Sequence, residues 1–319
     1  MPSPGRRASA PHGPARAHSG DELREGFIRL LQRSCERAAS AGQEATAYRS
    51  IARTLRAWCG EPWVHRTVFP AEHALVRQFI TQTGLQPAAP EGIVQHSLMA
   101  NTWIRVSHAM LGAMAPVPFL SLCEVAGQGH LHAALAAGRG VVLAHAHTLF
   151  VQLFWTWMSH EAMDPGVSIW QWAWGRTPAE IRDPRVRAIE SARELHRAAR
   201  ALRRGGQVQI LADGLQGRRK LALAFCGRMR GFETTFADLA LETGAAIVPV
   251  AVSLTADATI RIEFSAPLAE PVAGADRSER LAWYVRGYAE HLHRQWRRRA
   301  GDLSWFQMRK HLEFPPAGR

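Results

Sequence analysis

GVVLAHAHTLFVQLFWTWMSH, residues 140–160, is the longest stretch of the chain without Lys, Arg, Asp or Glu, and it carries the main evidence for the fold class. Its 21 residues are enough to cross a membrane as a helix, but three histidines, one of them the last residue, and a glutamine lie within it. The apolar run Val141–Ala144 is typical of a strand covered on both faces, and Phe150–Met158 is typical of a buried helix. The segment therefore predicts a strand, a turn and a helix inside a protein core.

Strands and helices alternate on both sides of this segment. Upstream, residues 120–140 predict a strand, a glycine turn and a short helix. Within residues 167–174 three tryptophans alternate, as on one face of a strand. Downstream we predict strands at Gln207–Leu211, Ala246–Val252 and Thr259–Phe264, and helices at Arg185–Arg204, Thr234–Thr243 and Arg277–Arg299. This order predicts an α/β fold with a mostly parallel central sheet flanked by helices.

The first third of the chain shows a helical pattern without strands. An apolar stripe of Leu23, Phe27, Leu30 and Leu31 follows the acidic pair at 21–22, and further helices are expected at Ala71–Thr83 and Gly92–Met114. The first residues are polar, rich in Pro, Arg and Ala, and lack the apolar core of a secretory signal. We therefore predict a disordered tail over 1–20, an N-terminal helical layer over 21–118 and an α/β core over 119–315.

The charge balance favours anionic partners. Lys and Arg number 39 against 27 Asp and Glu, a formal net charge of +12. Such a surplus suits anionic lipid headgroups, phosphate-bearing substrates or nucleic acid, but no nucleic-acid recognition motif is present, so no nucleic-acid partner is expected. The four cysteines are widely spaced and include no CxxC pair, which favours a reducing compartment over a disulfide framework or a thiolate zinc site.

Two loops at predicted strand ends carry residues suited to acid–base chemistry, and reactive groups gather at the carboxyl ends of parallel strands. His145 and His147 follow the strand Val141–Ala144, and Asp213 follows Gln207–Leu211. A histidine in this place can take a proton from a hydroxyl or amine, and a nearby carboxylate can hold its tautomer. From these residues alone, an alternative interpretation remains open, in which the histidines are hydrogen-bonded core residues and Asp213 is a turn residue. No third ligand accompanies the two histidines, so no metal is predicted.

Several short segments follow one another in a particular order across the core. They are EVAGQGHLHAALAAGRGVVL (124–143), HTLFVQ (147–152), LRRGGQVQILAD (202–213), FCG (225–227) with TT (234–235), GAAIVPV (244–250) and SW (304–305). From about residue 124 to 315, this series resembles the bacterial lipid A biosynthesis (lauroyl/myristoyl) acyltransferase family, within the lysophospholipid acyltransferase superfamily.

The resemblance implies a glycerolipid acyltransferase-like fold and a function. The family transfers a fatty acyl group from acyl carrier protein (acyl-ACP) or coenzyme A (acyl-CoA) to a hydroxyl or amine of a lipid or glycolipid, and His147 matches its general base. It implies no cofactor beyond the thioester co-substrate and no covalent enzyme intermediate, in keeping with the lack of a GxSxG motif. The expected partners are acyl carrier protein or a CoA thioester, and an anionic membrane lipid surface. Because no hydrophobic anchor is seen before Asp21, we expect a cytoplasmic protein bound peripherally to the cytoplasmic face of the inner membrane.

The sequence departs from the family pattern at one position. The family has a His, four further residues and then Glu or Asp, whereas this chain has Gln152 at the acidic position, which carries no charge to balance an imidazolium. Three explanations stay open: Asp213 supplies the charge, His147 works with Gln152 at a reduced rate, or catalysis has been lost. In the last case, a catalytically impaired homologue that binds lipid or acyl carrier would remain.

Other residues are candidates for substrate binding by their position. Arg218 and Arg219 follow Asp213 closely, and Arg176 follows the tryptophan-rich strand, so each can reach a phosphate group. The aromatic side chains near the histidine loop suit an acyl chain or a membrane interface. The predicted substrate-binding set is His145, Arg176, Arg218, Arg219, Trp155 and Trp172.

Overall fold

The computed structural model describes residues 19–85, 90–161, 169–172, 186–189, 192–215 and 219–317. For the two short strands at 169–172 and 186–189, and for residues 108, 109, 112, 113 and 159, only the backbone is described. The predicted tail over 1–20 lies almost entirely outside these residues, although Gly20 already belongs to the first helix.

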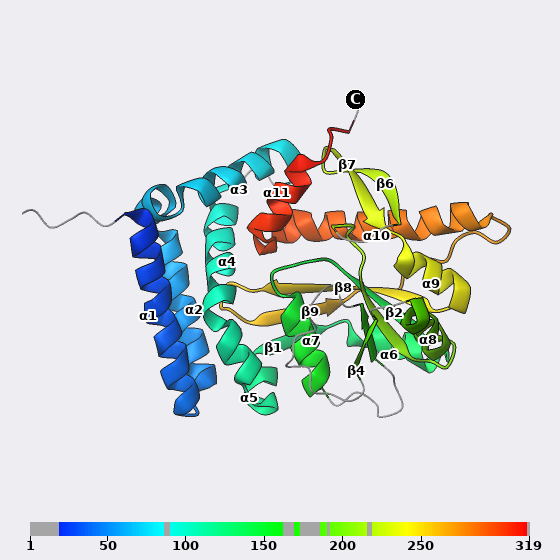
Figure 1. The fold of residues 1–319 in the computed structure, drawn as a ribbon, viewed down its shortest axis with the longest axis horizontal. Coiled ribbons are helices and arrows are strands. Elements are labelled where there is room, and N and C mark those ends of the chain that lie inside the picture. The colour runs from blue at the N-terminus through cyan, green and yellow to red at the C-terminus, as the bar shows by residue number, and fades with distance from the viewer. Residues whose placement is uncertain are drawn as a thin grey trace, which may run out of the picture.

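The N-terminal region is built of helices, as predicted. They are α1 Gly20–Ser40, α2 Glu44–Gly60, the π-helical turn η1 Val64–Val68, α3 Pro70–Thr83, α4 Pro90–Ala113 and α5 Pro116–Leu120. Ser19 caps α1 in a reciprocal capping box with Glu22, which satisfies amides at the start of the helix. Figure 1 shows α1 and α2 (blue) side by side against α4.

The apolar face predicted for α1 was partly wrong. Leu30 is 49% exposed and Leu23 is also exposed, whereas Ile28, Leu31 and Cys35 are buried. The buried residues recur at i, i+3 and i+7, which is equally a helical stripe. Packing of α1 against α4 selects this stripe over the neighbouring one.

A seven-stranded sheet forms the centre of the α/β part. Its strands are β1 Cys123–Ala126, β2 Val141–His145, β3 Ile169–Trp172, β4 Val186–Ile189, β5 Gln207–Leu211, β8 Ala246–Leu254 and β9 Ile260–Phe264. The order is β1-β9-β8-β2-β5-β3-β4. All neighbours are parallel except β8 and β9, which form an antiparallel pair, so the predicted mostly parallel sheet is confirmed. The central strand β2 is buried along its whole length.

Helices and a hairpin surround the sheet. They are α6 Gln128–Ala136, α7 Val151–His160, α8 Ala192–Leu202, the hairpin β6 Lys220–Phe225 and β7 Arg228–Glu233, α9 Thr235–Thr243, α10 Arg277–Arg299, η2 Ala300–Asp302 and α11 Trp305–Glu313. α9 and α10 pack on each other and on β8, while α6 packs on β8 and β9. The strand, turn and helix predicted for residues 140–160 are confirmed by β2 and α7. None of the described helices has both the length and the apolar content needed to cross a membrane.

One predicted helix was too long. Arg185–Arg204 divides into β4 and α8, because Val186–Ile189 pairs in parallel with β3 along its full length. The charged residues in this stretch match a helical pattern, but hydrogen bonding to a neighbouring strand overrides local propensity at the sheet edge. The helix α11 was not predicted.

The end of the chain packs against the N-terminal helices. η2 contacts α4, and α11 contacts α3 (Figure 1, red beside cyan). One continuous group of buried apolar residues extends from α1 through the sheet to α11. The helical layer and the α/β core therefore share a hydrophobic core, and the C-terminal segment joins them.

Candidate active site

His147 and Asp213 meet at the carboxyl ends of two adjacent strands. β2 and β5 are parallel neighbours, and His145 lies opposite Leu211 in their register. His147 and Asp213 each come two residues after the end of their strand, so they lie side by side. The His147 Nδ1 atom lies 2.6 Å from Asp213 Oδ1, and the His147 backbone amide donates to Asp213 Oδ2 at 3.2 Å. The pairing expected from the two loops is present.

Asp213 is itself held by a buried arginine. Arg230 in β7 donates from Nε to the Asp213 carbonyl oxygen at 2.9 Å and places Nη2 3.3 Å from Asp213 Oδ2. Both side chains have no exposed surface, whereas that of His147 is 21% exposed. A buried carboxylate needs a counter-charge and hydrogen bonds, and Arg230 supplies both.

Aromatic rings enclose the guanidinium of Arg230. Its central carbon lies 5.1–5.8 Å from the ring centres of Phe225, Phe232, Trp296 and Phe314. Ring faces attract a desolvated cation, so these contacts offset part of the cost of its burial. Burial lowers the pKa of Arg230 from its ordinary value, and the Asp213 charge opposes that shift.

The charge of Asp213 fixes the form of the histidine ring. Burial raises the pKa of this carboxyl. The His147 ring, the His147 amide and Arg230 lower it by more than burial raises it, so the pKa is about 2. Asp213 is therefore ionised at neutral pH and can only accept hydrogen bonds. Nδ1 of His147 must then carry the proton donated to Asp213, which leaves Nε2 as the basic atom of the neutral ring.

Gly214 allows the chain to turn away directly after Asp213. Its φ is +74°, and a Cβ at this position would lie 1.7 Å from the carbonyl oxygen of Gly231 in β7. A side chain here would push the loop after β5 away from the hairpin that carries Arg230. The close approach of two glycines thus holds the carboxylate and the guanidinium together.

The other predicted site residues lie in several different environments. The His145 ring is buried edge-on against Phe154 and Trp155, and burial, followed by the charge of His147, lowers its pKa to about 3. Gln152 is exposed on the first turn of α7, where its backbone carbonyl accepts from Thr156. Asp213 is the candidate orienter whose carboxylate contacts both the ring and the backbone amide of His147.

The predicted basic and aromatic contacts are only partly described. Arg219 is exposed and forms an ion pair with Asp238 at 3.2 Å. Trp155 is half-buried beside the histidine loop. Arg176, Arg218 and the side chain of Trp172 lie outside the described residues.

A cavity of about 450 Å³ opens next to the histidine loop, and Thr148 forms part of its wall. It lies along the second half of β8, which is parallel to β2, so it sits at the same edge of the sheet as His147. Four arginines line it: Arg261 from β9 and Arg294, Arg298 and Arg299 from α10. The acidic residues in its wall are Glu263 and Asp302. The cavity is therefore suited to an anionic group.

Sequence reasoning missed Arg230 and most of this cavity. A usable signal for Arg230 was the two-residue alternation of the hairpin, which places it on the same face as the buried Phe232. A charged residue on the apolar face of a strand indicates a buried partner. The cavity gave no such signal, because its walls come from strands and a helix far apart in the chain.

The comparison with known families agrees with this geometry. Residues 84–283, well over half of the chain, match the model of the family described as bacterial lipid A biosynthesis acyltransferase. The match begins at the end of α3 and ends within α10, so it includes part of the helical region as well as the histidine strand, the aspartate strand and the hairpin. No curated protein gives a significant match to the chain. The resemblance seen in the motif series is thus confirmed, and this chain belongs to the bacterial lipid A biosynthesis acyltransferase family.

Proposed function

We propose that this acyltransferase moves a fatty acyl group from acyl-ACP or acyl-CoA to a hydroxyl or amine of a lipid or glycolipid, with His147 as general base. The observation that supports this is the series His147–Asp213–Arg230, in which each side chain holds the next. It stands beside a cation-lined cavity at the carboxyl edge of a parallel sheet.

The reaction follows from the state of the ring. His147 Nε2 takes the proton of the acceptor hydroxyl while its oxygen attacks the thioester carbonyl carbon. The carbon–sulfur bond of the resulting tetrahedral intermediate then breaks, and the departing thiolate takes the proton from the imidazolium. An ester or amide and a free thiol are the products. Asp213 stabilises the imidazolium between the two transfers, which is the part a neutral Gln152 cannot play.

The arginines of the cavity are proposed to bind a phosphate on a substrate. Phosphopantetheine, coenzyme A and phosphorylated glycolipids all present one, and guanidinium groups pair with phosphate through two parallel hydrogen bonds. Arg298 and Arg299 are exposed at the end of α10, where they can also meet anionic headgroups. We propose a peripheral position on the cytoplasmic face of the inner membrane on this basis.

Acyl transfer by the purified protein tests the proposal. Acyl-ACP and acyl-CoA are offered in separate reactions with a lipid extract as acceptor, and products are identified by mass spectrometry. His147→Ala is expected to remove at least 99% of the turnover, because loss of a general base costs about 10²–10⁴-fold. His132→Ala, an exposed histidine on α6, is the matched control and keeps full turnover.

Two results would overturn the catalytic proposal. Turnover retained by His147→Ala excludes this residue as the base. Binding of lipid or acyl carrier without any turnover by the wild-type protein favours the catalytically impaired homologue. Comparing lipids from cells with and without the protein then identifies the acceptor.

A further inference from the structure

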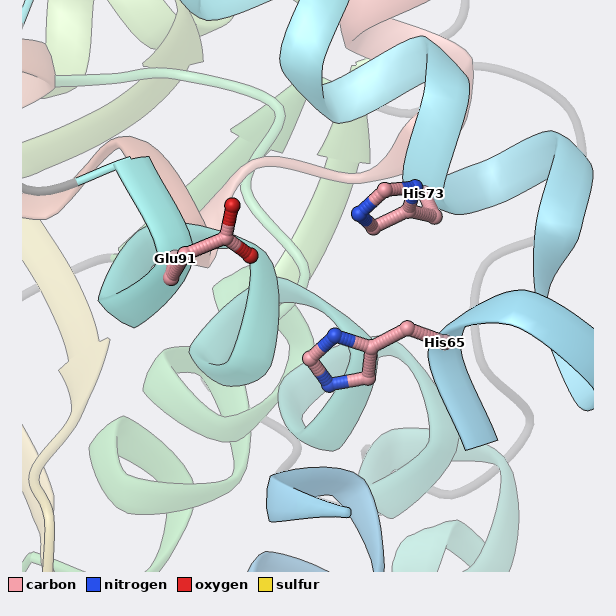
Figure 2. Close-up of side chains that lie close together, drawn as sticks. All are labelled: His65, His73 and Glu91. Atoms are coloured by element: carbon pink, nitrogen blue, oxygen red, sulfur yellow. The ribbon is translucent and has the colours of Figure 1, made fainter. Parts of the chain in front are cut away.

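Three potential metal ligands converge where η1, α3 and α4 meet, in a part of the fold separate from His147. They are His65 in η1, His73 in the first turn of α3 and Glu91 in the first turn of α4. One ligand atom of each side chain lies within 4.8 Å of the ligand atoms of the other two. Figure 2 shows the two rings and the carboxylate turned toward a common point.

The His65 ring is fixed in the orientation that a metal ligand requires. The side chain is 8% exposed, and its Nε2 atom lies 2.6 Å from the carbonyl oxygen of Cys59 at the end of α2. A carbonyl only accepts, so Nε2 carries the proton and Nδ1 keeps the lone pair. In Figure 2 the ring nitrogen next to the side-chain attachment faces Glu91 and His73. Metal-binding histidines commonly show this pattern, in which the second nitrogen donates to a backbone carbonyl.

The backbone around His65 also favours a site. η1 is a turn of π-helix, and such turns are rare and frequently lie at functional sites. Here the turn lies between α2 and α3 and brings His65 close to His73, with the two ring centres 5.7 Å apart. Packing two imidazoles together stabilises the fold little by itself, whereas a cation between the rings would be bound by a nitrogen of each.

Glu91 completes a donor set of mixed type. Arg77 on α3 pairs with the Oε1 atom of Glu91, and the second oxygen, Oε2, takes no part in that pair. The arginine thus orients the carboxylate from the side, as partners of metal-bound carboxylates do. Two imidazole nitrogens and one carboxylate oxygen match the ligands that zinc takes in open, three-ligand sites.

We propose that His65, His73 and Glu91 bind one Zn²⁺ ion, with water as the fourth ligand. Ligand atoms about 2.1 Å from a tetrahedral zinc lie about 3.4 Å from one another. The present separations are within 4.8 Å, so the ligand atoms must come closer by up to about 1.4 Å. His73 is half-buried and Glu91 is exposed, so both can rotate inward onto the fixed His65 ring. The ion then joins η1, α3 and α4 and stabilises the N-terminal helices.

Zinc binding is tested on the untagged full chain after removal of metals with EDTA, because a histidine tag would itself bind zinc. Isothermal titration with ZnCl₂ is expected to show one ion per chain. At a free zinc concentration about 100 times the Kd, the midpoint of thermal unfolding should rise by about 5 °C. Co²⁺ in place of zinc should give the visible absorption of a tetrahedral complex.

The variants separate this site from adventitious binding. The double variant His73→Gln, Glu91→Gln is expected to bind zinc at least tenfold more weakly and to lose the thermal shift. The matched control His132→Gln, Glu36→Gln changes two exposed residues elsewhere and keeps both. His147→Ala also keeps both, which distinguishes this site from the catalytic one. Unchanged zinc affinity in the His73, Glu91 variant would overturn the proposal, as would a wild-type protein that takes up no zinc or shows no thermal shift.

Discussion

At the scale of residues, Asp213 has two duties, since it orients His147 and balances the buried charge of Arg230. Asp213→Asn removes the negative charge that faces both His147 and Arg230. We expect acyl transfer to fall by 10²-fold or more, given that the analogous change in serine proteases costs about 10⁴-fold. Stability should fall by about 3–5 kcal/mol, because the guanidinium is left unpaired. Steady-state turnover and urea unfolding measure the two losses.

A second substitution separates these duties. Adding Arg230→Met to Asp213→Asn removes the unpaired cation, so part of the stability should return while turnover stays low. If turnover recovers together with stability, Asp213 serves only to balance Arg230. Gln152→Glu offers a contrast in the same assay and should change turnover less than tenfold, because an exposed carboxylate on α7 cannot replace the contact already made by Asp213.

At the scale of elements, the loop after β5 depends on a glycine that touches the hairpin. Gly214→Ala must adopt a φ of +74° and also place a Cβ 1.7 Å from the Gly231 carbonyl oxygen. We expect a loss of about 3 kcal/mol or more in stability, together with lower turnover as Asp213 moves away from Arg230.

Gly244→Ala is the matched control for this change. Gly244 has a φ of +73° at the end of α9, but open space surrounds the site where its Cβ would be. It should cost only the backbone strain, about 1 kcal/mol, and leave turnover intact. Equal losses of stability for the two variants in urea unfolding would show that the close approach of Gly214 to Gly231 contributes nothing to stability.

At the scale of the whole molecule, three buried histidines make the fold sensitive to acid. Burial is the main cause that lowers the pKa of His145 to about 3 and those of His291 and His311 to about 4. In the unfolded chain these rings take up protons near pH 6.5. Between pH 6.5 and 4 the unfolded state therefore binds more protons, and stability falls as the pH falls, by about 1.4 kcal/mol per pH unit for each ring.

Urea unfolding at pH 7, 6 and 5 measures this slope. His291→Gln should remove about one third of it, whereas His132→Gln, an exposed ring, should leave it unchanged. Asp213 adds almost nothing to the slope between pH 7 and 5, because its carboxyl is ionised there in both states: its pKa is about 2 in the folded protein and about 3.9 in the unfolded chain. A stability that stays constant from pH 7 to 5 would contradict the prediction.

Local patterns in the sequence were enough to identify the elements of the core. Continuous apolar runs indicated β2 and β5, and the turn residues after them indicated the two loops that carry His147 and Asp213. These features depend on neighbours in the chain, since a strand covered on both faces must be apolar throughout. The same patterns failed for β4, whose residues suit a helix and become a strand only by pairing with β3.

By itself, the sequence determined the α/β class, the membership of an acyltransferase family and the two strand ends that carry His147 and Asp213. Only the tertiary structure decided that β2 and β5 are neighbours, that a buried Arg230 holds Asp213 together with His147, and that His65, His73 and Glu91 converge. The physical reason is that periodicity records which face of an element is buried, but not against which distant element. That choice is made by the packing of the whole core, in which segments far apart in the chain compete for the same neighbours.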